Sequence, residues 1–183
     1  MSDVEIRPTT PADLNPLADV LVQVHAVDGY PVEGVDDPRA WVELPDSLGQ
    51  WTALLGGTPT GHVALTRCTE GDPAVSHYLA QGGSRCAQFA AVSRLFVDKN
   101  SRGKSLASRL MDAAESKARE EGLQLILQVM AKDRQAVRMY ESRGWRFLGK
   151  FDHATPDGGR FPALAYCLPG IEQAERPNRG PRP

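Results

Sequence analysis

The sequence has few cysteines and no long apolar run, and these absences exclude several protein classes. Its three cysteines are widely spaced and form no CxxC pair, so neither a disulfide framework nor a metal site is predicted. No window approaches the roughly 18 unbroken apolar residues of a membrane helix, and the start lacks the basic-then-apolar order of a signal peptide. We therefore expect a cytoplasmic protein, with no membrane partner and no bound metal, in which Cys68, Cys86 and Cys167 are reduced.

An excess of one charge is also lacking. The 183 residues contain 21 Lys+Arg and 23 Asp+Glu, for a net charge of -2. General nucleic-acid binding, which needs a basic excess to neutralise phosphates, is therefore disfavoured. A domain has roughly 100 to 200 residues, so the length predicts a single domain over residues 1–168. The proline-rich stretch 169–183 has almost no large apolar side chains and is predicted to be a disordered tail.

Hydrophobic periodicity predicts a mixed sheet with helices on its faces. Apolar residues at helical spacing predict three helices. The first follows the N-cap at Thr10-Pro11, the second runs from Leu106 to Ala118 and ends before Gly122, and the third includes Ala136 to Tyr140. Polar, glycine-containing residues 70–85 are expected to form a long surface loop. Apolar or β-prone runs predict strands at 50–55 and 62–66, joined as a hairpin, and at 89–97, 123–129, 145–151 and 161–168.

The segment Ser101-Arg102-Gly103-Lys104-Ser105-Leu106-Ala107-Ser108 lies between a predicted strand and a predicted helix. A helix start exposes unpaired backbone N–H groups and favours negative charge, and small residues let a phosphate approach the backbone. Four cations flank this position, which suits several phosphates: Lys99, Arg102, Lys104 and Arg109. The alternative is an ordinary glycine-containing loop with a solvated basic patch. Neither GxxxxGK[ST] nor GxGxxG is present, so nucleotide-hydrolase and dinucleotide folds are not supported.

Three segments in order resemble the GNAT superfamily of acyl-CoA-dependent N-acetyltransferases. They are Val92-Ser93-Arg94-Leu95-Phe96-Val97-Asp98, then Arg102-Gly103-Lys104-Ser105-Leu106-Ala107, then Ala136-Val137-Arg138-Met139-Tyr140-Glu141-Ser142-Arg143-Gly144-Trp145. The resemblance implies an α/β fold with a mixed, mostly antiparallel central sheet flanked by helices. It also implies an enzyme that transfers an acetyl group from acetyl-CoA, as co-substrate, to a primary amine of a small molecule, peptide or protein. The amine would attack directly in a ternary complex.

Roles for individual residues follow from the same resemblance. The backbone of Leu95, Phe96 and Val97 would pair with the pantetheine arm, and an N–H of Leu95 or Phe96 would polarise the thioester oxygen. Tyr140 would be the general acid that protonates the departing thiolate. Asp133 stands at a position that contacts pantetheine. The loop residues that would bind the pyrophosphate are Arg102, Gly103, Lys104, Ser105, Leu106, Ala107 and Ser108.

Three positions depart from the family pattern. Ser105 replaces the usual central glycine, and a positive φ there would be strained. Asp133 replaces a common asparagine and so lacks the amide donor. Ala91 replaces a common glutamate base, which leaves ordered water as the default proton acceptor. The loss of that glutamate also keeps open a non-catalytic module that binds acyl-CoA as a ligand.

The stretch 28–46 carries six acidic residues against one arginine. By resemblance it lines the acceptor side, where Asp28, Tyr30 and Glu33 would bind the amine substrate; the alternative is a solvated surface. His25 is expected to pack at the end of the first helix. Oligomeric state stays open, a homodimer included. The arginines after residue 133 are expected to form a solvated basic face rather than a nucleic-acid contact: Arg134, Arg138, Arg143 and Arg146.

Overall fold

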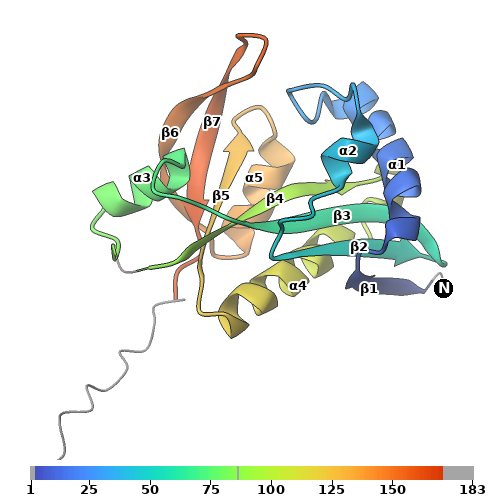
Figure 1. Ribbon diagram of the computed structural model, residues 1–183, viewed down its shortest axis with the longest axis horizontal. Coiled ribbons are helices and arrows are strands. Elements are labelled where there is room, and N and C mark those ends of the chain that lie inside the picture. The colour runs from blue at the N-terminus through green and yellow to red at the C-terminus, as the bar shows by residue number, and fades with distance from the viewer. Residues whose placement is uncertain (1–2, 86, 171–183) are drawn as a thin grey trace, which may run out of the picture.

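The computed structural model describes residues 3–85 and 87–170, which contain a seven-stranded sheet in the order β1-β2-β3-β4-β5-β7-β6 (Figure 1). All neighbouring strands are antiparallel except β4 and β5, which confirms the mixed, mostly antiparallel fold class. The strands are β1 (Val4–Pro8), β2 (Gly49–Leu55), β3 (Thr58–Arg67), β4 (Phe89–Val97), β5 (Gln124–Met130), β6 (Arg146–Ala154) and β7 (Arg160–Cys167). The helices are α1 (Leu14–Asp28), α2 (Pro38–Val42), α3 (Pro73–Ala80), α4 (Leu106–Glu120) and α5 (Arg134–Ser142), with short 3-10 turns at Pro11–Asp13 and Lys99–Ser101.

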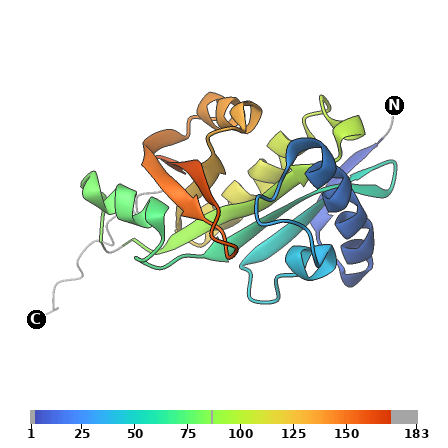
Figure 2. The same cartoon turned by 90° about the horizontal axis from the view of Figure 1, so that it is seen from above.

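The helices cover both faces of the sheet, as Figure 2 shows for α4 and α5 against α1 and α2. In α4, Leu106, Leu110, Ala114 and Ala118 are all 2 % exposed or less, because their spacing places them on one stripe of the helix. This stripe packs with α5 residues on one face in the main core. On the other face, α1 and α2 pack around Phe96, and α3 packs beneath β6 and β7. Helices therefore cover both faces of the sheet at the strands that carry apolar side chains on both faces.

Strands β4 and β5 separate part of the way along their length (Figure 1). Their parallel pairing spans only Phe89–Ala91 of β4 and Gln124–Ile126 of β5, although β4 continues to Val97 and β5 to Met130. The facing edges of both strands are therefore left without a strand partner beyond this point. An extended ligand with hydrogen-bonding groups can use such an edge.

A β-bulge in β4 lies close to this separation. His62 pairs with Phe96 and Ala64 pairs with Ser93, so Val63 faces both Arg94 and Leu95. Arg94 has φ of 52°, a left-handed conformation that is uncommon for a residue other than glycine. Bulges bend the strand that carries them and redirect its side chains, often beside active sites.

Buried His62 of β3 supports the bulge. Its Nδ1 lies 3.0 Å from the carbonyl oxygen of Arg94. Because a carbonyl only accepts, Nδ1 carries a proton and donates it. Burial lowers the pKa of His62 to about 4, so the imidazole is neutral near pH 7 and holds the strained carbonyl without bringing a charge into the core.

Two elements correct the sequence-based expectations. The predicted loop over 70–85 contains α3, which begins at an Asp72 N-cap whose side chain accepts a hydrogen bond from the N–H of Ala74, followed by Pro73 at the first helical position. β1 was not predicted and adds an edge strand beside β2. The other predicted strands and the three predicted helices are confirmed, with shifts of a few residues at their ends. The predicted tail lies outside the described residues from 171 onward.

Among the described residues, 3–85 and 87–170, no helix is both long and apolar enough to cross a bilayer.

Candidate active site

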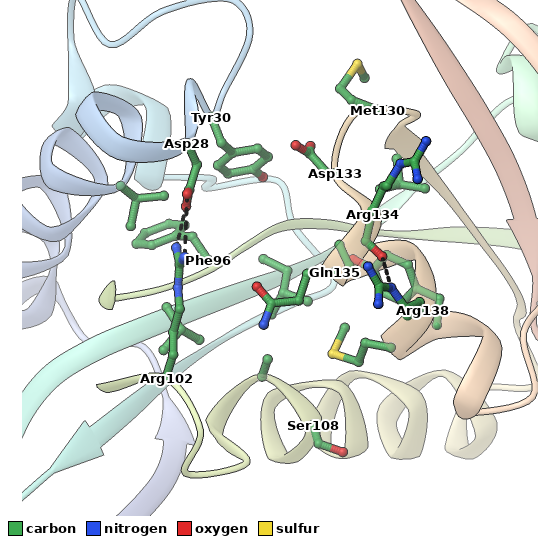
Figure 3. Close-up of a pocket in the computed structure, with 18 of the residues that line it drawn as sticks. Asp28, Tyr30, Phe96, Arg102, Ser108, Met130, Asp133, Arg134, Gln135 and Arg138 are labelled. Atoms are coloured by element: carbon green, nitrogen blue, oxygen red, sulfur yellow. Dashed lines mark hydrogen bonds and ion pairs between the residues drawn. The ribbon is translucent and has the colours of Figure 1, made fainter. Parts of the chain in front are cut away.

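A cavity of about 960 Å³ occupies the space where β4 and β5 separate. This volume lies within the range of small-molecule and cofactor sites. Figure 3 shows Asp28 and Tyr30 from the end of α1 on one side, with Phe96 and Arg102 on the side of Asp28, and Asp133, Arg134, Gln135 and Arg138 of the α5 region on the other. Residues 92–97 of β4 and 128–130 of β5 also line the cavity. The site thus combines three stretches of the chain that are far apart in the sequence, within residues 24–30, 92–108 and 128–140.

The N-terminus of α4 faces this cavity. Gly103 and Ser105 both have positive φ, 78° and 59°, and they turn the chain so that the first residues of α4, 106–108, line the cavity wall. The Ser105 side chain at the N-cap makes no capping hydrogen bond, and within residues 3–85 and 87–170 no other side chain caps this start, which leaves its backbone N–H groups for another acceptor. The arrangement suits a phosphate. The predicted strain at Ser105 is confirmed by its left-handed φ.

Two cations link the end of α1 to other parts of the cavity lining: Arg102 of the segment before α4 and Lys132 of the turn between β5 and α5. Arg102 forms an ion pair with the carboxylate of Asp28, shown as dashed lines in Figure 3. The Nζ of Lys132 donates to the carbonyl oxygen of Asp28 at 2.8 Å and lies 3.1 Å from Oδ1 of Asp133. Both carboxylates that line the cavity, Asp28 and Asp133, therefore already have a cationic partner.

Tyr140 lines the cavity from α5 and is 7 % exposed. Its ring packs against Trp145 with a centroid distance of 6.1 Å, while its hydroxyl makes no hydrogen bond to the described residues. Burial raises the pKa of Tyr140, and the charge of Asp133 raises it further, so the phenol stays protonated near pH 7. A protonated phenol with an unused donor can serve a developing anion in the cavity.

Tyr30 lies across the cavity from Asp133 (Figure 3). Burial is the main cause that raises the pKa of Tyr30, and the nearby Tyr140, Glu33 and Asp133 add to it. Its ring meets Trp41 of α2 edge-on, with a centroid distance of 5.8 Å. Tyr30 therefore presents a neutral hydroxyl on a side chain held by aromatic packing.

The structure brings most of the predicted site residues to this one cavity. Two of them do not line it: Lys104 is exposed, and the carboxylate of Glu33 lies 2.6 Å from Nε2 of His153 on β6. The predicted residues that do line it are Asp28, Tyr30, Leu95, Phe96, Val97, Arg102, Gly103, Ser105, Leu106, Ala107, Ser108, Asp133 and Tyr140. His25, expected to pack rather than act, does not line it.

The expected solvated basic face after residue 133 holds for Arg134, Arg138 and Arg146, which are exposed, and is wrong for Arg143. Arg143 turns inward, where its guanidinium pairs with Glu115 and Asp112 of α4 and donates to the Ser108 hydroxyl at 2.6 Å. Arg134 and Arg138 line the cavity instead. The spacing of the arginines along the sequence does not predict which of them pairs with α4 and which line the cavity, because this depends on how α4 and α5 pack together.

Sequence reasoning missed several cavity residues, of which Arg94 is the most distinctive. Arg94 lines the cavity from the bulge, and its guanidinium carbon lies 4.7 Å from the ring centroid of Trp41. Burial lowers its pKa. The available signal was the polar pair Ser93-Arg94 inside an otherwise apolar strand.

These parts can perform one kind of chemistry together. An open strand edge can bind an extended amide-containing arm, an uncapped helix start can bind phosphates, and a buried phenol can donate to a leaving group. The fold and the cavity are those expected of the acyl-CoA-dependent acyltransferase class.

The family assignment agrees with this class. The model of the acetyltransferase (GNAT) family matches residues 17–145, so the chain belongs to this family. No curated protein sequence matches the chain. The likeness is therefore carried by the family model and by solved structures.

Solved structures share the fold at low sequence identity. An N-acetyltransferase from Staphylococcus aureus Mu50 has a TM-score of 0.70 and 17% identity, over 93% of this chain and 100% of that one. The ribosomal-protein-S18-alanine N-acetyltransferase from Escherichia coli has a TM-score of 0.69 and 18% identity, over 96% and 98%. NAA60 from Arabidopsis thaliana in complex with acetyl-CoA has a TM-score of 0.66 and 16% identity, over 90% and 98%.

Proposed function

We propose that this protein transfers an acetyl group from acetyl-CoA to a primary amine. The observation that carries the proposal is the cavity that joins the free edge of β4, the uncapped start of α4 and the hydroxyl of Tyr140, a largely buried residue. Family membership and the acetyl-CoA complex of a protein with the same fold support this choice of donor.

In the proposal, backbone groups of Leu95, Phe96 and Val97 pair with the pantetheine arm along the edge that β5 leaves open. The pyrophosphate lies at the start of α4, where the segment 102–108 supplies N–H groups, and Asp133 lies beside the arm. An N–H near Leu95 or Phe96 stabilises the negative charge that develops on the thioester oxygen. Binding both substrates in one cavity aligns amine and thioester for direct attack.

Tyr140 acts on the leaving group in this proposal. A free thiol has a pKa of about 8.5, below that of a phenol, so proton transfer from Tyr140 to a thiolate in water would be uphill. Burial raises the pKa of Tyr140, and a thiolate released into the same cavity is desolvated too, which raises the pKa of the thiol in the same direction. Tyr140 donates first a hydrogen bond and then its proton as the C–S bond breaks.

Direct transfer needs no acetylated enzyme. Of the described residues that line the cavity none is a cysteine, and burial raises the pKa of Cys68 to about 12, which leaves little nucleophilic thiolate. The free thiols of Cys68 and Cys167 fit the cytoplasmic location that we propose, where thiols stay reduced.

The experiment that tests the proposal measures free thiol released from acetyl-CoA in the presence of a panel of amines. Tyr140→Phe removes the phenol proton and is expected to lower kcat about 10²- to 10⁴-fold, the usual contribution of a positioned acid. Calorimetric affinity for acetyl-CoA should change little. Acetyl-CoA binding without amine-dependent thiol release would instead support a non-catalytic acyl-CoA-binding module.

A further inference from the structure

The two carboxylates among the described residues that line the candidate site, Asp28 and Asp133, each have a cationic partner. The nearby carboxylate of Glu33 is hydrogen-bonded to Nε2 of His153, and its charge also acts on Arg94. Arg94 forms no ion pair or side-chain hydrogen bond with the described residues, and its buried Nη1 has no hydrogen-bond partner. An anionic group of an acceptor would therefore find a guanidinium with unused N–H donors here.

Arg94 is held in place by its backbone and by aromatic packing. Its carbonyl is fixed by His62, and its left-handed φ directs the side chain from the bulge. The guanidinium lies on the ring of Trp41, and Trp41 is itself held by Tyr30 and Phe96. A stacked guanidinium keeps its N–H groups in a fixed plane, which suits the planar, two-oxygen geometry of a carboxylate.

The position of Arg94 separates it from the phosphate side of the cavity. Trp41 belongs to the α1–α2 layer around Phe96, whereas α4 and α5 pack on the opposite face of the sheet. The other cavity arginines without an ion pair among the described residues, Arg134 and Arg138, lie on α5. Arg94 is thus placed to bind a group of the acceptor rather than a phosphate at the start of α4.

We propose that Arg94 is a specificity-determining residue that binds a carboxylate of the acceptor, so that the acceptor is an amine whose molecule also carries a carboxylate, as in an α-amino acid. This inference rests on the proposed function and narrows its substrate class. The strained backbone at Arg94 has a function in this account, because strain that persists in a folded protein commonly marks a binding or catalytic site.

The test compares the proteinogenic amino acids as free acids with the same amino acids as carboxamides, by thiol release from acetyl-CoA. The measured quantity is the ratio of kcat/KM for acid and amide. For the best acceptor, the wild type is expected to prefer the acid about 10- to 100-fold, the effect of one charge-assisted hydrogen-bonded pair. Arg94→Gln should bring the ratio close to one, and Arg94→Lys should leave an intermediate ratio because it keeps charge but loses the planar fork.

Arg39→Gln is the matched control. Arg39 lies on the same helix as Trp41 but is exposed and pairs with Glu43, so its loss should leave the ratio unchanged. Because the ratio is taken within one protein sample, partial loss of folded protein does not alter it. Acetyl-CoA titration of each variant separately reports that the donor site is intact.

The outcomes separate this inference from the proposed function. Equal use of acids and amides by the wild type, an acid preference that survives in Arg94→Gln, or acetylation of carboxylate-free amines alone would overturn the role of Arg94 and leave acetyl transfer standing. Failure to bind acetyl-CoA would overturn both.

Discussion

At the scale of single residues, the site is built on conformations that cost stability. Arg94 and Ser105 are the residues other than glycine with positive φ among those described, and both line the cavity. A left-handed conformation costs a residue with a side chain roughly 1–2 kcal/mol. The fold therefore holds strain in two places, at the strand edge and at the helix start, where a ligand would contact the backbone.

A substitution at Gly103 tests whether the turn before α4 requires a left-handed backbone conformation. Its φ is 78°, and a Cβ added there would meet nothing within 4 Å, so Gly103→Ala introduces conformational strain without a steric clash. We expect a loss of about 1 kcal/mol in the free energy of unfolding, measured by urea denaturation, together with weaker acetyl-CoA binding.

Gly71→Ala is the control for this substitution. Gly71 is exposed, has no positive φ, and its added Cβ would lie 3.7 Å from the Thr69 hydroxyl oxygen. Alanine there should be neutral or slightly stabilising, because it restricts the unfolded chain. If both alanine variants were equally stable, the left-handed turn before α4 would not be the conformation of the protein in solution.

At the scale of elements, a buried charge cluster joins α4 to α5 and β6. The side chain of Glu115 is only 6% exposed and lies 3.0 Å from the Arg143 guanidinium. The indole N–H of Trp145 donates to the same carboxylate at 3.2 Å. Arg143 also donates to Ser108, in the first turn of α4. The cluster thus fixes the helix that carries Tyr140 relative to the helix start that faces the cavity.

Arg143→Met should lower the free energy of unfolding by about 2 kcal/mol, because buried Glu115 loses its closest cation and keeps the more exposed Arg119, at 3.4 Å, and the Trp145 indole. Arg146→Met, at an exposed position nearby, should change it by less than about 0.5 kcal/mol. Adding Glu115→Gln to Arg143→Met should recover part of the loss, since the amide removes the buried charge and keeps an acceptor for Trp145. Strictly additive losses in the double variant would contradict a coupled pair.

Element prediction from sequence succeeded where one periodicity ran long enough. The stripe of α4 and the apolar run of β4 are such cases. β1 and α3 were missed because they are short, with five and eight residues. Signals for both are present: Val4 and Ile6 alternate with polar residues, and Asp72-Pro73 is a cap followed by a first-turn proline.

At the scale of the whole molecule, the acidic stretch 28–46 and the basic segment 99–109 were predicted separately, as an acceptor side and a phosphate side. The structure joins them directly through Asp28 and Arg102, 74 residues apart. Spacing along the chain carries no information on such a contact. The candidate site could therefore be located from motifs, but its free and engaged charges, and with them the importance of Arg94, depend on the fold.

The central claim is that the cavity between β4 and β5 transfers an acetyl group from acetyl-CoA to an amine. The most direct measurement follows both products in one reaction, with mass spectrometry for the acetylated amine and a thiol assay for free CoA. The account predicts that the two form in equal amounts, and that both fall together in Tyr140→Phe. Free CoA without an acetylated amine, or no reaction with any amine despite bound acetyl-CoA, would contradict it.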